Sequence, residues 1–90
     1  MGTISRAYFT GANDPKNQIR IDGIGLKESA SEQDVELWQA ILGTGNPVMI
    51  TASDSILCQV TSGMYTSDKG GIKIRMQGDD GEWTNQVDVN

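Results

Sequence analysis

The sequence predicts a single α+β domain, mainly antiparallel β-sheet or a small sandwich, in the order β-β-α-β-β-β-β with one amphipathic helix. Three observations support this fold class. The segment from Ser31 to Leu42 has apolar residues at helical spacing. Short runs on both sides of it alternate apolar and polar residues, as half-buried strands do. Ninety residues are one domain, so residues 1–90 are expected to share one core.

The first part of the chain predicts two strands. Thr3 to Thr10 contains the bulky residues Ile4, Tyr8 and Phe9, which favour a strand. Residues 11–17 then include glycine, Asn-Asp and proline, which favour a turn. The run 18–22 alternates isoleucine with charged residues, so we predict a second, half-buried strand there.

The predicted helix has a clear beginning. Ser31 with Asp34 three residues later forms a looser version of the capping box, and Ser29 with Glu32 is an equally good alternative frame. Acidic residues in the first turn also suit the positive end of a helix dipole. Both features predict that a helix begins near residue 30.

An apolar stripe supports the same helix. Its members fall on one helical face and are Val35, Trp38, Ile41 and Leu42. We expect this stripe to pack on the sheet and to place Trp38 in the core. Gly43 is expected to end the helix.

After the helix the chain is predicted to be wholly β. The predicted strands are Val48 to Ala52, Ile56 to Tyr65, Ile72 to Gln77 and a terminal run that begins near Trp83. Glycine-containing turns separate the later strands, at 67–71 and 78–81. We therefore expect three consecutive hairpin-like units that form a meander.

The residue types present argue against an enzyme. The chain contains no histidine, which excludes histidine-dependent triads and histidine metal sites. Its single cysteine, Cys58, lies in an apolar run, so we interpret it as a core residue rather than a nucleophile. We expect no catalytic residue, no cofactor and no metal site. A small enzyme that uses weak acid–base groups is the alternative.

The acidic turn from Asp79 to Glu82 has two interpretations. Several carboxylates in a flexible loop can hold a hard cation such as Ca²⁺. The turn lacks the spaced acidic residues of an EF-hand, however, and it lies between two predicted strands. We interpret it as a solvated hairpin turn.

Charge and hydropathy restrict the partners and the location. A net charge of −5 and only seven basic residues argue against binding to a nucleic-acid backbone. No leader segment, membrane anchor or membrane-spanning run is expected. Because a small secreted domain normally needs disulfides, we expect synthesis in a reducing cytoplasm.

The predicted interface lies on two strands near the ends of the sequence. An open antiparallel sheet leaves edge strands whose backbone groups invite another chain to pair. The run 82–90, with Trp83, Val87 and Val89, is the first candidate, and the run 3–10, with Tyr8, is the second. Trp83 is either an interface anchor or a core residue, and the sequence does not separate these.

Taken together, these features favour a structural or assembly module that acts through protein–protein contacts, as a homo-oligomer or as part of a larger assembly. Its composition, rich in Gly, Ser, Thr, Asn, Asp and Gln, is similar to that of small bacteriophage virion proteins, such as capsid-cementing (capsid decoration) proteins and tail-tube subunits. The similarity is one of composition and size, and it assigns no residue; it implies a location in the virion. The alternative is an acidic inhibitor or binding module that blocks a basic partner such as a host defence protein.

Overall fold

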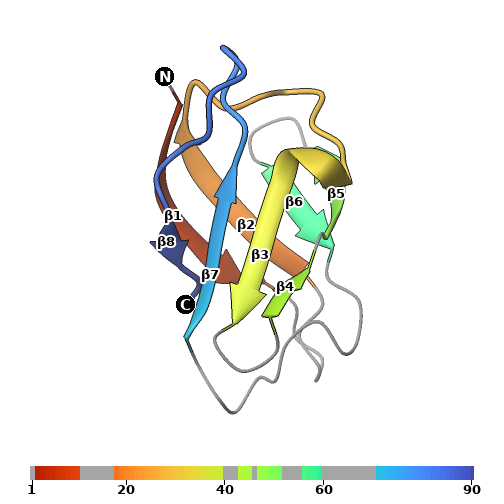
Figure 1. Ribbon diagram of the computed structural model, residues 1–90, viewed down its shortest axis with the longest axis vertical. Helices are drawn as coiled ribbons and strands as arrows, with labels where there is room; N and C mark the ends of the chain where they lie inside the picture. The colour runs from red at the N-terminus through yellow and green to blue at the C-terminus, as the bar shows by residue number, and fades with distance from the viewer. Residues whose placement is uncertain (1, 11–17, 40–42, 46, 52–55, 60–70) are drawn as a thin grey trace.

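The computed structural model describes residues 2–10, 18–39, 43–45, 47–51, 56–59 and 71–90. These residues form eight strands and one 3-10 turn, η1 (Glu32–Asp34) (Figure 1). In chain order the strands are β1 (Thr3–Phe9), β2 (Gln18–Ile24), β3 (Val35–Gln39), β4 (Gly43–Gly45), β5 (Val48–Thr51), β6 (Ile56–Gln59), β7 (Ile72–Met76) and β8 (Val87–Asp88).

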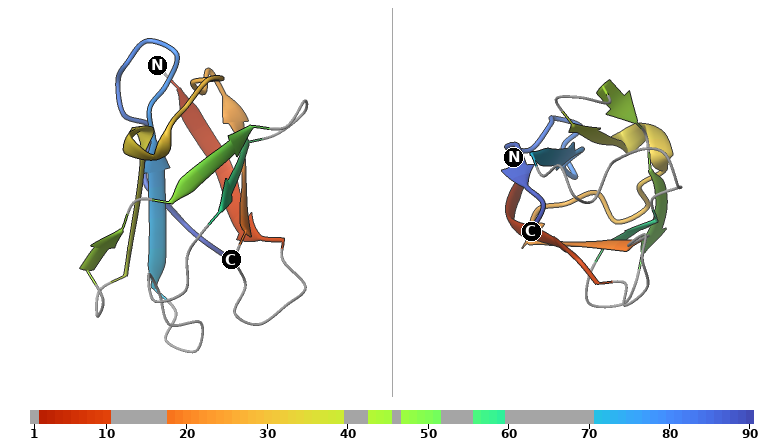
Figure 2. Two further views of the ribbon diagram at one scale, coloured as in Figure 1. Left: turned by 90° about the vertical axis from the view of Figure 1, so that its right-hand side faces the viewer. Right: turned by 90° about the horizontal axis from the view of Figure 1, so that it is seen from below.

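Two antiparallel four-stranded sheets surround a common interior (Figure 2). The first has the order β1-β2-β6-β5 and the second the order β4-β3-β7-β8. Apolar side chains from both sheets form one buried cluster, whose members are Ile4, Ala7, Ile19, Ile21, Val35, Leu37, Ile56, Cys58, Ile72, Ile74 and Met76. Burial of these side chains is the main driving force for folding.

The last residues of the chain join the two sheets along one side. Val89 forms a parallel bridge with Ala7 of β1. The Phe9 amide donates to the Asn90 carbonyl at 2.9 Å, and the Asn90 amide donates to the Ala7 carbonyl at 3.0 Å. Because β8 also pairs with β7, neighbouring strands follow one another around the interior in the order β5, β6, β2, β1, β8, β7, β3 and β4.

The predicted α+β fold class is wrong, because the described residues contain no α-helix. Where a helix was expected from Ser31, the chain makes the single turn η1 and then continues as strand β3. The predicted contact between Ser31 and Asp34 does form, since the Ser31 amide donates to the Asp34 carboxylate at 2.8 Å. Such a contact closes one turn, and tertiary pairing decides whether a helix or a strand comes after that turn. The expected end of the helix at 40–42 lies outside the described residues.

Strand β3 shows why the helix prediction failed. Val35, Leu37 and Gln39 are buried, whereas Glu36 and Trp38 between them are only half-buried. This alternation has a period of two, as required when one face of a strand faces the core. Trp38 therefore lies on the outer face of the sheet, and the expectation that it belongs to the core is wrong.

The predicted meander is also wrong. β5 pairs with β6, and β7 pairs with β8, as the expected hairpins require. Strands β6 and β7, however, belong to different sheets. The predicted continuation of β6 beyond Gln59 and residues 67–70 of the expected loop lie outside the described residues.

A bulge at Ser5 sets which side chains of β1 face outward. The pairing register of β1 with β2 shifts between Ile4 and Arg6, so that Ile4 and Ala7 both point inward and are buried. Arg6 and Tyr8 consequently lie on the outer face. Gly23 pairs with Ile4 beside the bulge, and a Cβ atom at Gly23 would collide with the Thr3 carbonyl oxygen, so this close approach requires glycine.

Candidate functional site

The outer face of β3 and β7 carries a group of side chains that we call the tryptophan face. Its members come from β3, from β7 and from the segment that precedes β8; they are Glu36, Trp38, Lys73, Arg75, Trp83 and Gln86. Both tryptophans of the chain belong to it. Aromatic and arginine side chains at a surface are typical of binding sites.

Arg75 organises the centre of this face. It lies opposite Glu36 in the pairing of β3 with β7. Its Nε donates to Glu36 Oε2 at 2.8 Å, and one terminal nitrogen lies 2.8 Å from the same oxygen. The guanidinium also lies 4.5 Å from the centroid of the Trp83 ring, a cation–π contact. Arg75 is therefore held between a carboxylate and an aromatic ring.

A hollow of about 300 Å³ lies beside this pair and is lined by Glu36, Trp38, Arg75 and Gln86. That volume is at the lower end of the range for small-molecule sites, so it suits one side chain or a small ligand. The side chains of Trp38 and Gln86 make no hydrogen bond with any residue that the structure describes. The hollow thus offers an aromatic ring and polar groups whose hydrogen-bonding capacity is unused.

The charges around the hollow are balanced. Glu36 pairs with Arg75, and Lys73, the cross-strand neighbour of Trp38, pairs with Asp88 at 2.6 Å. Both partners of each pair are partly exposed, so each pair contributes little to stability. Neither sign of charge dominates this part of the surface.

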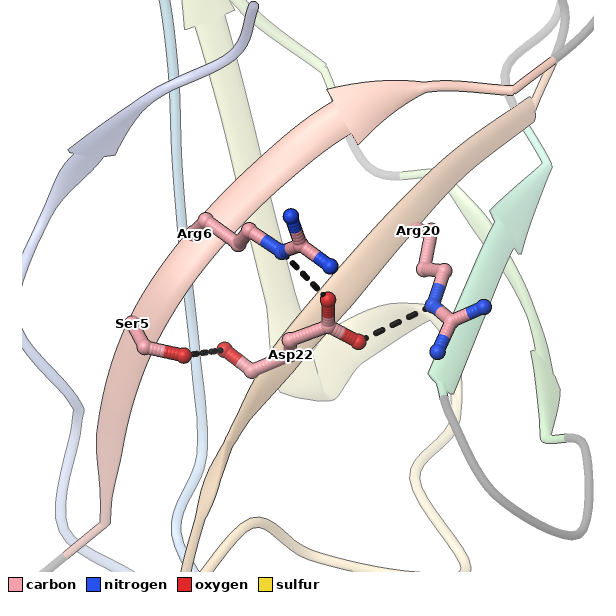
Figure 3. Close-up of polar contacts among 4 residues, drawn as sticks. All are labelled: Ser5, Arg6, Arg20 and Asp22. Carbon is pink, nitrogen blue, oxygen red and sulfur yellow. Dashed lines mark hydrogen bonds and ion pairs between the residues drawn. The ribbon is translucent and has the colours of Figure 1, made fainter.

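The outer face of β1 and β2 carries a second cluster, which we call the arginine face and which comprises Arg6, Tyr8, Arg20 and Asp22. Figure 3 shows its two arginines and Asp22. Asp22 lies between two guanidinium groups: Arg6 Nε donates to Asp22 Oδ2 at 2.7 Å, and Arg20 Nε donates to Asp22 Oδ1 at 2.9 Å. Arg6 also lies 4.9 Å from the centroid of the Tyr8 ring. Hydrogen bonds from Arg20 and then from Arg6 lower the pKa of Asp22 below its usual range.

The structure separates the four residues that were predicted to form an interface. Tyr8 is half-buried on the arginine face, and Trp83 is half-buried on the tryptophan face. Val87 and Val89 are half-buried and pack against the core. Trp83 and the two valines of the first candidate run therefore lie in different environments, and Tyr8 of the second candidate run lies on the other outer face.

The two predicted edge strands pair with each other within the chain. Beyond the contacts of Val89 and Asn90 with β1, the side chain of Asn85 acts as a further partner. Ile4 N–H donates to Asn85 Oδ1 at 2.8 Å, and Asn85 Nδ2 donates to the Ile4 carbonyl at 3.1 Å. Backbone groups of β1 at these positions are therefore satisfied within the chain.

Sequence reasoning missed most of the tryptophan face. It placed Trp38 in the core, and it assigned neither Glu36 nor Gln86 to a binding site. One signal was present, because Glu36 and Trp38 share one parity in β3 while the buried residues share the other. The contact of Arg75 with Trp83 depends on the long-range arrangement of the chain and has no local signal.

Cys58 lies in the core between β2 and β5. It is fully buried, and burial raises the pKa of its thiol. This position matches the interpretation of Cys58 as a core residue, because a reactive thiolate needs exposure and a positive environment.

The acidic turn at 79–82 is closed by its own backbone. The Glu82 amide donates to Asp80 Oδ1 at 3.0 Å, which lowers the pKa of Asp80, and the Gly81 amide donates to the Gly78 carbonyl at 3.1 Å. Among the described residues there is no group of three acidic or cysteine side chains placed to hold a metal ion.

In the same part of the chain, no helix has the length and apolar character needed to cross a membrane.

We compared the chain with known proteins in three ways. No protein-family model matches it, no curated protein is similar to it, and no solved structure matches its fold. The functional conclusion therefore depends on the geometry of the site.

Proposed function

We propose that this domain is a non-enzymatic binding module of a protein assembly, and that it contacts its protein partner through the tryptophan face. The observation that carries the proposal is the position of both tryptophans on the outside of one sheet, where Trp38 lines an open hollow. Tryptophan and arginine side chains contribute most to the binding energy of protein interfaces. The partner is a second copy of this chain or another subunit of the assembly.

The arrangement of the tryptophan face supports a docking surface more than a structural one. Trp38 is only half-buried although it is among the largest apolar side chains of the chain. A partner that covers it would gain the burial of that ring. Arg75 is already held in place by Glu36 and Trp83, so little side-chain entropy would be lost when the surface is covered.

The setting of a bacteriophage virion, as a capsid-decoration or tail component, is part of the proposal and is supported by composition and size. The acidic inhibitor of a basic host protein is the competing function. The two differ in the identity of the partner, and the same experiment separates them.

Site-specific photo-cross-linking tests the proposed surface. A benzophenone amino acid would replace Gln86, which lies exposed at the hollow, in the cells that naturally produce the protein. We expect a cross-linked product, to be identified by mass spectrometry. If the cross-linked partner is a second copy of the chain or a subunit of a particle, the result supports a structural role. If it is a basic host protein, the result supports inhibition.

The matched control places the same amino acid at Thr3, an exposed position on β1. We expect little product from this position. Absence of a protein adduct at position 86, or equal yields from positions 86 and 3, would contradict the proposed docking surface.

A further inference from the structure

We propose that the hollow on the tryptophan face receives an arginine side chain of the partner protein, with its guanidinium stacked on Trp38 and bonded to Glu36. This inference rests on the proposed function and specifies the chemistry of the contact. It is drawn from a comparison of the carboxylate–guanidinium clusters on the two outer faces.

The arginine face shows the complete form of such a cluster. Each oxygen of Asp22 accepts a hydrogen bond from a different guanidinium, Oδ2 from Arg6 and Oδ1 from Arg20. One of these guanidinium groups also lies over an aromatic ring, that of Tyr8. One carboxylate can therefore hold two arginines on the surface of this fold, one of them stacked on a neighbouring ring.

The tryptophan face also contains a carboxylate, an arginine and aromatic rings, but these groups are less fully paired. Both contacts of Arg75 go to Oε2 of Glu36. Glu36 has no second partner among the residues that the structure describes. Arg75 uses the ring of Trp83, whereas Trp38 holds no cation in the described part of the chain.

The groups that line the hollow match a guanidinium well. Glu36 and Trp38 both line it, and Gln86 adds an amide carbonyl oxygen. A guanidinium can donate in its plane to carboxylate and carbonyl oxygens while its face stacks on an aromatic ring. An ammonium group is a compact, strongly hydrated charge that lacks this planar shape, so lysine fits less well.

The charge of the chain also favours a cationic occupant. The net charge of −5 attracts basic partners over distances of about a Debye length, ~8 Å at physiological ionic strength. The two cations of the tryptophan face, Arg75 and Lys73, are each paired with an acid. An acidic occupant would instead meet the carboxylate of Glu36 and the net negative charge of the chain.

Short peptides test the proposal directly. The probe is acetyl-Gly-Gly-Arg-Gly-Gly-amide, and its control replaces arginine by citrulline, which keeps the shape and removes the charge. The two tryptophans give two indole N–H signals in a nitrogen–proton NMR spectrum. We expect the arginine peptide to shift the Trp38 signal in a saturable manner and to bind roughly fivefold or more tightly than the citrulline peptide.

Two variants with the same change in net charge identify the contact. Glu36→Gln removes the proposed partner, and we expect it to abolish the preference for arginine over citrulline. Glu82→Gln alters an exposed acid in the turn that precedes Trp83 and should leave that preference intact. If both variants lose the preference for arginine equally, the preference comes from the net charge of the chain, and the proposal is overturned.

Two other results would also overturn the proposal. In one, the indole N–H signal of Trp38 does not shift even at the highest soluble concentration of the arginine peptide; in the other, the arginine and citrulline peptides bind equally tightly. The proposed function would survive that result if position 86 still forms a cross-link with a protein, because the partner would then dock without an arginine in the hollow. The two failures are therefore distinguishable.

Discussion

The arginine face and the tryptophan face each contain a carboxylate, arginine and an aromatic ring, but they differ in how fully these groups are paired. On the arginine face both oxygens of Asp22 hold a guanidinium. On the tryptophan face Glu36 pairs with one described residue, Arg75, and it lines a hollow together with Trp38. The difference separates a cluster that closes on itself from one that can accept a further group.

The largest expected effect concerns which side of β3 faces the core. Leu37 is buried and Trp38 is half-buried on the outside. We expect Leu37→Ala to lower the free energy of unfolding by about 2–5 kcal/mol, and Trp38→Ala to lower it by only about 1 kcal/mol. Denaturant unfolding of the two variants measures both values. A larger loss for Trp38→Ala than for Leu37→Ala would mean that Trp38 lies in the core, as the helix prediction required, and it would contradict the outward position of Trp38.

The next effect concerns the join between the two sheets. Asn85→Ala would leave the amide and carbonyl of Ile4 without their partner, and we expect a loss of about 1–3 kcal/mol. The neighbouring Gln86→Ala is the control, because Gln86 is exposed and should change stability by less than about 0.5 kcal/mol. Similar losses in both variants, measured by thermal unfolding, would mean that Asn85 does not connect β1 with the end of the chain.

A smaller effect distinguishes the arginine face by its response to acid. The folded-state pKa of Asp22 is below its unfolded value of about 3.9, mainly because of Arg20 and then Arg6. The resulting stabilisation is present above the unfolded pKa and is lost as the pH falls through the folded pKa. We expect Asp22→Asn to make the acid-induced loss of stability below about pH 4 shallower than in the wild type.

Unfolding at several pH values would measure this slope. Part of the acid sensitivity should persist in Asp22→Asn, because the pKa of Asp34 is also lowered, through the Ser31 amide and Lys27. An unchanged slope in the variant would show that the double pairing of Asp22 does not hold in solution.

The smallest effect on stability is expected for Glu36→Gln. Its pair with Arg75 is about two-thirds buried on both sides, and we expect a loss of no more than about 1 kcal/mol. A larger loss would mean that the cluster on the tryptophan face supports the fold, as the arginine face does. Denaturant unfolding decides this before the variant is used in binding experiments.

The sequence predicted the strands better than it predicted their environment. Strands β1, β5, β6, β7 and β8 lie within the predicted runs, and β2 begins where its run was predicted to begin and continues two residues beyond it. In β3 the inward-facing residues include the polar Gln39, which breaks the alternation of apolar and polar residues expected for a strand. The outward-facing Trp38 comes three residues after Val35, the spacing that is typical of one face of a helix. A polar side chain inside and an aromatic one outside thus obscured the period of two.

The candidate site was harder to predict because its contacts are long-range. Asn85 contacts Ile4 across 81 residues, and the bulge at Ser5 that turns Arg6 and Tyr8 outward depends on the pairing with β2. The apolar run around Cys58 correctly indicated that this cysteine would be a core residue. No such local signal showed which aromatic residues would share a face.

Backbone amide shifts during titration with the arginine peptide would test the difference between the two faces most directly. The assigned amide signals would be followed across the whole chain. We expect the changes to cluster at Glu36, Trp38, Arg75 and Gln86, and to leave Arg6 and Arg20 unaffected. Changes centred on the arginine face, or spread evenly over both faces, would contradict the account.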